Sequence, residues 1–173
     1  MSKYNAKKVI VTPDGTLFEE QLVKKYNLDV TGIRFDSKME GEYYQKLLLM
    51  KKFREIKDFS CQPKFVLQEN PKITYIADFL VTDLDGSQRV IDIKGVETST
   101  FRVKLKLFRV KYPTLPIEIL VKRRGEFVPL QQVKKEKAAR KRATKNLLKQ
   151  AERKMKNVCY HQNGSEIYRN QKR

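Results

Sequence analysis

The sequence of 173 residues is short of cysteine, histidine and long apolar runs. Its two cysteines, Cys61 and Cys159, lie far apart and match no zinc spacing, so we expect free thiols in a reducing, cytosolic compartment. The single histidine, His161, lies in the tail and receives no role. No run of about 18 apolar residues is present, so no membrane span is expected. The N-terminal residues MSKYNAKK also lack the apolar core of a signal peptide.

Acidic residues are scarce beside basic ones. The chain has 38 Lys and Arg against 20 Asp and Glu, a formal net charge of +18. Residues 129–173 hold 14 Lys and Arg and 3 acids, a net charge of +11, which leaves +7 for residues 1–128. A charge of this size points to a polyanionic partner, and we expect DNA, although charge alone does not distinguish DNA from RNA. The tail is therefore expected to be a separate basic module.

Hydrophobic periodicity predicts a small α/β unit with a mixed sheet, in the order helix, three strands, helix, strand. Asp36 or Ser37 can cap the first helix, and Ser37 with Glu40 has the spacing of a capping box. A strand, a helix and a strand in succession favour a right-handed parallel crossover. The expected elements are a helix from residue 36 or 37 to residues 53–56, a strand over 59–68, a hairpin over 73–95, a helix from residue 98 or 99 to 112 and a strand over 117–121. Within the strand over 59–68, Pro63 marks an edge or an irregularity.

The regions on either side of this unit are expected to differ from it. Before it, we expect a strand over 8–11, a turn over 12–15 and a short helix over 17–26. After it, a long basic helix is expected from Gln131 to about Val158, with a loose end from Tyr160. This helix places a narrow apolar stripe on every fourth residue: Ala139, Ala143, Leu147, Ala151 and Met155. The predicted domains are an arm over 1–34, a core over 35–128 and a basic helical extension over 129–173.

The predicted hairpin contains three charged residues in otherwise apolar strands. Asp92 and Lys94 are two residues apart and therefore share one face of their strand. A two-residue loop, Asp85-Gly86, would put Asp78 on the other face. A three-residue loop, Leu84-Asp85-Gly86, with glycine in the left-handed conformation, would bring Asp78 opposite Asp92. We favour the three-residue loop, and a bulge would have the same effect.

Two facing carboxylates in an apolar sheet repel unless one is protonated or a cation lies between them. Oxygen ligands without histidine or cysteine favour Mg²⁺ or Mn²⁺, which suits metal-assisted hydrolysis of phosphodiesters. Lys94 beside them can hold a water molecule or stabilise charge on a phosphate. The alternative is an ordinary Asp92–Lys94 salt bridge at a strand end, with Asp78 a hydrogen-bonded strand residue.

Further candidates surround this trio. On a helical wheel Glu40 faces the sheet, which makes it the fourth site residue, unless it only completes the capping box. Gln62 either reaches the site or satisfies an edge backbone group, and Lys104 either approaches a phosphate or is a solvated helix residue. The tail around 134–156 is expected to grip phosphates. The candidate nucleic-acid contacts are Gln62, Lys104, Lys134, Lys135, Arg140, Lys141, Arg142 and Lys145.

Glu40 in a helix, Asp78 in a strand and Asp92-Ile93-Lys94 after a hairpin resemble the PD-(D/E)xK nuclease superfamily. The usual proline before the first acid is replaced by Ala77. A closer resemblance is to a phage family of small endonuclease-like proteins long catalogued as of unknown function. The matching stretches are "KYNAKK", "RFDSKMEGEYY", "IKDFSCQPKFVLQ", "ITYIADFLV" and "VIDIKGVETSTFRVKLKLF". They cover most of residues 33–121 and the extreme N-terminus, with residues 12–31 resembling an insertion and the tail after Pro129 an extension.

The resemblance implies a restriction-endonuclease-like core, a phage or prophage origin in a bacterial cytoplasm, and Mg²⁺-dependent nuclease chemistry. It implies that Glu40, Asp78, Asp92 and Lys94 are catalytic. On this reading Asp78, Asp92, the Ile93 carbonyl and Glu40 are the expected metal ligands. With no sequence-reading domain recognised, we expect a structure-selective DNA endonuclease of phage recombination or replication, such as a Holliday-junction resolvase acting as a homodimer. The alternatives are a sequence-specific or transposon-type endonuclease, or a non-catalytic DNA-binding accessory protein.

Overall fold

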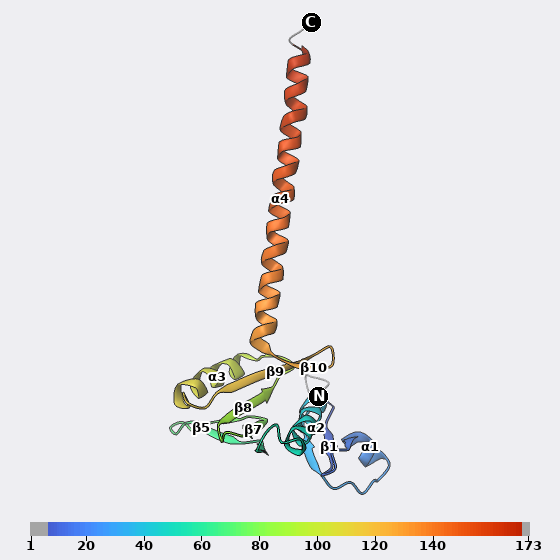
Figure 1. The fold of residues 1–173 in the computed structure, drawn as a ribbon, viewed down its shortest axis with the longest axis vertical. Helices are drawn as coiled ribbons and strands as arrows, with labels where there is room; N and C mark the ends of the chain where they lie inside the picture. The colour runs from blue at the N-terminus through green and yellow to red at the C-terminus, as the bar shows by residue number, and fades with distance from the viewer. Residues whose placement is uncertain (1–6, 171–173) are drawn as a thin grey trace. The chain divides into compact units, whose positions relative to one another are not determined.

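The computed structural model describes residues 7–170, with side chains described as far as residue 155. The predictions for the side chains of Cys159 and His161, and for the first six residues of MSKYNAKK, fall outside the described parts. The chain divides into two units, Met1–Leu130 and Gln131–Arg173. Figure 1 follows the elements along the chain. Among the residues described, no helix is both long and apolar enough to cross a membrane.

The first unit is built around a five-stranded mixed sheet with the strand order β10-β9-β8-β7-β4. Strand β8 is antiparallel to β7 and parallel to β9. The parallel pair was predicted, because the helix expected from residue 98 or 99 to 112 connects these two strands. This arrangement confirms the α/β fold class. The bounds of its strands are β4 Asp58–Cys61, β7 Phe79–Thr82, β8 Gln88–Ile93, β9 Ile117–Arg123 and β10 Glu126–Pro129.

Two helices cover opposite faces of this sheet. Helix α2 (Lys38–Lys52) packs in a cluster with Ile91 and Ile93, whereas α3 (Ser99–Lys111) packs in another with Val90. Alternate residues of β8 thus enter different cores, as the two-residue period of a strand requires. Both predicted caps are present, because Ser37 accepts from the Glu40 N–H and Thr98 accepts from the Phe101 N–H.

Two of the predicted strands are each broken by a bend. The break in the strand over 59–68 confirms the irregularity predicted at Pro63, whereas the break at Ala77 and Asp78 corrects the continuous strand expected through Asp78. The first break lies between β4 and β5 (Lys64–Gln68), at Gln62 and Pro63, and the second lies between β6 (Ile73–Ile76) and β7, at Ala77 and Asp78. The two breaks lie opposite each other, because the β4–β7 pair and the β5–β6 pair have the same register. Gln62 has a φ of 51° and Pro63 lacks an N–H, so neither residue can continue a regular ladder. The bend leaves Asp78 directly before β7.

The N-terminal segment forms a small sheet with the order β2-β1-β3, from Leu17–Glu19, Val9–Val11 and Ile33–Phe35. The predicted first strand and turn are present, but the predicted helix begins only at Glu20 and forms α1 (Glu20–Lys25). Strands β3 and β10 were not predicted. Helix α2 approaches this sheet at Gly41, where a Cβ would lie 2.6 Å from Val9 Cγ2.

The second unit is helix α4, Leu130–Asn170. The long basic helix is therefore confirmed, but the prediction of a loose end from Tyr160 is wrong, since the backbone stays helical to Asn170. Every residue from 134 to 155 is exposed. Its sequence offers neither a proline nor, before Gly164, a glycine to end a helix.

Candidate functional site

The hairpin between β7 and β8 has the turn that brings the two aspartates together. The Asp83 N–H donates to the Ser87 carbonyl at 2.8 Å, and Gly86, with φ 86°, closes a loop of three residues. The strands pair from Thr82 with Gln88 to Phe79 with Ile91. The next pair in this register is Asp78 with Asp92, in a non-hydrogen-bonded position, where Cα atoms of a regular ladder are about 4.5 Å apart. The predicted three-residue loop and register are confirmed.

The side chain of Asp78 supplies the last hydrogen bond between the two strands of the hairpin. Its Oδ2 accepts from the Ile93 N–H at 2.6 Å, at a point where the bent strand no longer supplies a carbonyl. Burial, followed by the charge of Asp92, raises the pKa of Asp78 to about 6, although Lys94 and the Ile93 N–H act in the opposite direction. Asp78 thus ionises at a higher pH than an ordinary aspartate, and a positive charge beside it would lower its pKa again.

Asp92 is completely buried, with 0% of its side chain exposed. Neither of its carboxylate oxygens has a hydrogen bond of good geometry. Lys94 Nζ lies 3.0 Å from Asp92 Oδ1, close enough for an ion pair but not aligned as a hydrogen bond. Burial raises the pKa of Asp92, and Lys94 opposes this shift. A buried acceptor pair with so few donors is costly, and it fits a cation that would complete its coordination.

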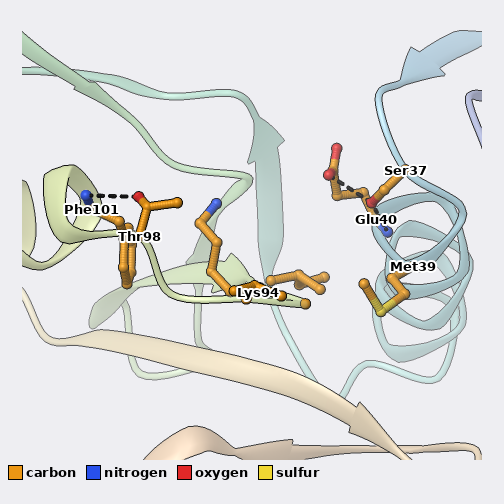
Figure 2. A pocket seen from close by; sticks show the side chains of 9 residues that line it. Ser37, Met39, Glu40, Lys94, Thr98 and Phe101 are labelled. Atoms are coloured by element: carbon orange, nitrogen blue, oxygen red, sulfur yellow. Dashed lines mark hydrogen bonds between the residues drawn. The ribbon is translucent and has the colours of Figure 1, made fainter. Parts of the chain in front are cut away.

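Lys94 is the positive charge of this group. Burial lowers its pKa, but the carboxylates of Asp92 and Asp78 outweigh burial, and the net shift is upward. The ammonium group also lies 5.5 Å from the centre of the Phe101 ring. Figure 2 shows the Lys94 side chain extending from the end of β8, between the start of α3 and the first turn of α2. The amine therefore stays charged at neutral pH.

Glu40 faces Lys94 across a pocket of about 330 Å³ that is also lined by Met39 and Thr98. The side chain of Ser37 fixes Glu40, since its Oγ donates to Glu40 Oε1 at 2.7 Å and accepts from the Glu40 N–H at 3.3 Å. Burial, followed by the charge of Asp78, raises the pKa of Glu40. Glu40 thus takes part in the helix cap and also faces the pocket at the end of β8.

The residues available to hold a metal ion are Asp78, Asp92, the Ile93 carbonyl and, at the rim, Glu40. Asp78 and Asp92 offer oxygens of the hard type that Mg²⁺ and Mn²⁺ prefer. Within the described part of the chain, no three His, Cys, Asp or Glu side chains form a compact metal-binding group. The arrangement fits a cation held by the carboxylates of Asp78 and Asp92, with the charge of Glu40 farther from the ion.

The weaker candidates lie in different places. The Gln62 side chain is exposed, and its contribution is a backbone N–H that donates to the Asp78 carbonyl at 2.8 Å. Lys104 is half-buried on α3. The remaining predicted contacts are all exposed on α4: Lys134, Lys135, Arg140, Lys141, Arg142 and Lys145.

Two residues near the site were not among the predictions. Asp36 raises the pKa values of Glu40 and Asp78, and its carboxylate is paired with Lys8 Nζ at 3.2 Å. The Tyr75 hydroxyl is buried without a hydrogen bond of good geometry; burial, followed by the charge of Asp92, raises its pKa. The position of Asp36 directly before the Ser37 cap was a usable signal. No sequence signal pointed to Tyr75, because the bend in the hairpin is what brings Tyr75 near Asp92.

Comparisons with known proteins give one result. No curated protein and no solved structure matches the chain. A family described as "Protein of unknown function (DUF1064)" matches residues 22–126, more than half of the sequence. The matched span contains Glu40, Asp78, Asp92 and Lys94, together with the central sheet strands as far as the start of β10. The chain therefore belongs to the DUF1064 family.

Proposed function

We propose that the protein is a metal-dependent DNA endonuclease of the PD-(D/E)xK type. The observation that carries this proposal is the pairing of Asp78 and Asp92 at the end of β8, with both oxygens of the buried Asp92 lacking hydrogen bonds of good geometry. Such a pair is destabilising in an apolar sheet unless it serves a cation. The order of helix, bent hairpin strands, helix and strand agrees with the core that the superfamily resemblance implies.

In this proposal the side chains have distinct roles. Asp78, Asp92 and the Ile93 carbonyl hold Mg²⁺ or Mn²⁺, and Glu40 contributes from the rim. When bound, the ion supplies a water molecule of lowered pKa and offsets charge on the phosphoryl group. Lys94 is charged, because neighbouring carboxylates raise its pKa, so it orients the water and stabilises charge on the phosphate but does not take up a proton.

The proposed substrate is branched DNA, such as a four-way junction, in phage recombination or replication. Resolving a four-way junction needs two cuts, so the proposal includes a homodimer with two copies of the site. The preference for branched DNA rests on the candidate site, on the basic helix α4 and on the lack of a recognised sequence-reading domain among the described residues. This is consistent with recognition of DNA shape.

A cleavage assay tests the proposal. Wild-type protein and Asp92→Ala are incubated with Mg²⁺ or Mn²⁺ and with duplex, single-stranded, flap and four-way DNA. We expect metal-dependent cleavage by wild type, with a preference for branched DNA, and none by Asp92→Ala. Absence of any cleavage by wild type contradicts the nuclease proposal, and cleavage by Asp92→Ala contradicts the site. Preference for one duplex sequence would favour the sequence-specific alternative, and a monomeric mass in solution would contradict the homodimer.

A further inference from the structure

Helix α4 has two chemically different faces. At 3.6 residues per turn, eight of its basic residues fall within an arc of about 160°. These residues define the basic face: Lys134, Lys135, Lys137, Lys141, Arg142, Lys145, Lys149 and Arg153. The opposite side holds Ala139, Ala143, Leu147 and Ala151, with only Arg140 and Lys154 as basic residues between 130 and 155. Figure 1 shows α4 as one uninterrupted helix, so the faces are continuous along it.

We propose that the basic face of α4 binds the phosphate backbone of duplex DNA without reading its sequence, which holds the DNA for the site on the first unit. The choice of DNA rests on the proposed function. The choice of a polyanion rests on charge: residues 130–155 carry ten Lys and Arg against two acids, a net charge of +8. Residues 1–128 carry +7. Neither a second copy of α4 nor another copy of the first unit has the net negative charge that this face requires.

The side chains on this face suit phosphates. All eight are exposed, and six of them are lysines, which act as compact point charges, whereas arginine is better suited to bidentate contacts with bases. Of the residues described, none forms an ion pair with Lys141, Lys145 or Lys149. From Lys134 to Arg153 the face extends over about 28 Å of helix axis. B-DNA of that length presents about 16 phosphate charges, so several phosphates are within reach of the face.

The helix provides a matched pair of variants that tests this face. K141Q/K145Q removes two charges at the centre of the basic face, whereas R140Q/K154Q removes two charges from the opposite side. Both pairs change the net charge equally, and glutamine keeps a helix propensity close to those of lysine and arginine. Binding of full-length protein to a 30-base-pair duplex is measured by fluorescence anisotropy in EDTA, which prevents metal-dependent cleavage, at several salt concentrations.

We expect K141Q/K145Q to make the slope of log K against log salt less negative by about 1.8, at about 0.9 per lost phosphate contact. R140Q/K154Q should change the slope by less than half of that. Circular dichroism should show unchanged helicity in both variants. Equal effects of the two pairs, or no effect of either, would overturn the proposal, as would tighter binding of duplex RNA than of duplex DNA or strong preference for one DNA sequence.

The inference about α4 and the nuclease proposal can be refuted separately. Face-dependent binding of the duplex, together with no cleavage of duplex, single-stranded, flap or four-way DNA in Mg²⁺, would keep the inference and refute the proposed function. Cleavage of four-way DNA in Mg²⁺ at equal rates by wild type and K141Q/K145Q, with equal affinities of the two for the duplex, would refute the inference and keep the nuclease.

Discussion

Neutralising Asp78 should make the metal-free protein more stable at neutral pH. The substitution Asp78→Asn removes a half-buried charge that faces Asp92, while the amide oxygen can still accept from the Ile93 N–H. The pKa of Asp78 is 3.8 in an ordinary environment and about 6 in the folded protein. Between these two pH values the folded chain binds more protons than the unfolded chain, so the free energy of unfolding falls as pH rises.

The size of the effect follows from the shift. A difference of about two pKa units corresponds to about 3 kcal/mol at 1.36 kcal/mol per unit, and this penalty is fully present above pH 6 and absent below pH 4. Asp78→Asn should therefore raise the free energy of unfolding by up to about 3 kcal/mol at pH 7.5 and leave it almost unchanged at pH 4. Saturating Mg²⁺ should stabilise wild type but not the variant.

The assay is urea unfolding in EDTA and in Mg²⁺ at pH 4, 6 and 7.5. Asp58→Asn is the control, because Asp58 lies on the neighbouring strand but has its pKa lowered by the side chain of Lys51, so its loss should bring no gain. The reasoning is refuted if Asp78→Asn is less stable than wild type at pH 7.5 in EDTA, or if its effect is the same at every pH.

Three further changes test other parts of the structure. Gly41→Val should lower the free energy of unfolding by about 1–3 kcal/mol, because a Cβ there lies 2.6 Å from a side chain of β1, whereas Lys46→Val at an exposed position of α2 should cost less. Ser37→Ala should cost about 1 kcal/mol by removing the α2 cap, and it should also weaken cleavage by releasing Glu40; equal stability would contradict the cap. Lys94→Gln should slow cleavage on the order of 100-fold while Mn²⁺ binding persists, and unchanged kinetics would exclude its role.

Local sequence signals predicted the parts of the fold that depend on neighbouring residues. The caps at Ser37 and Thr98 were readable because their side chains bond the backbone three residues later. Gly86, with positive φ, suits the last position of a two-residue loop and of a three-residue loop, so the register was predicted from the pattern of charges, since only the three-residue loop gathers the acids. The structure has this register, in which Asp78 lies opposite Asp92.

Features that depend on contacts between distant segments were not predicted. Strand β3 exists because Ile33–Phe35 pairs with β1, more than twenty residues earlier. Strand β10 has only four residues and pairs with β9 across a tight turn. The break at Ala77 and Asp78 was hidden because the sequence on both sides keeps a strand-like pattern, whereas Pro63 indicated an irregularity in the partner strand. The placement of Tyr75 near Asp92 follows from that bend and could not be read separately.

Binding of a divalent cation by the paired carboxylates is the central claim, and calorimetric titration of Mn²⁺ into the metal-free protein measures it most directly. Wild type is expected to bind Mn²⁺ with release of protons at pH 6, because the pKa of Asp78 is raised to about 6 and an ionised pair is needed to hold the ion. Asp92→Asn is expected to lose this binding while remaining folded. Binding of equal affinity in Asp92→Asn, or no binding by wild type, would contradict the account.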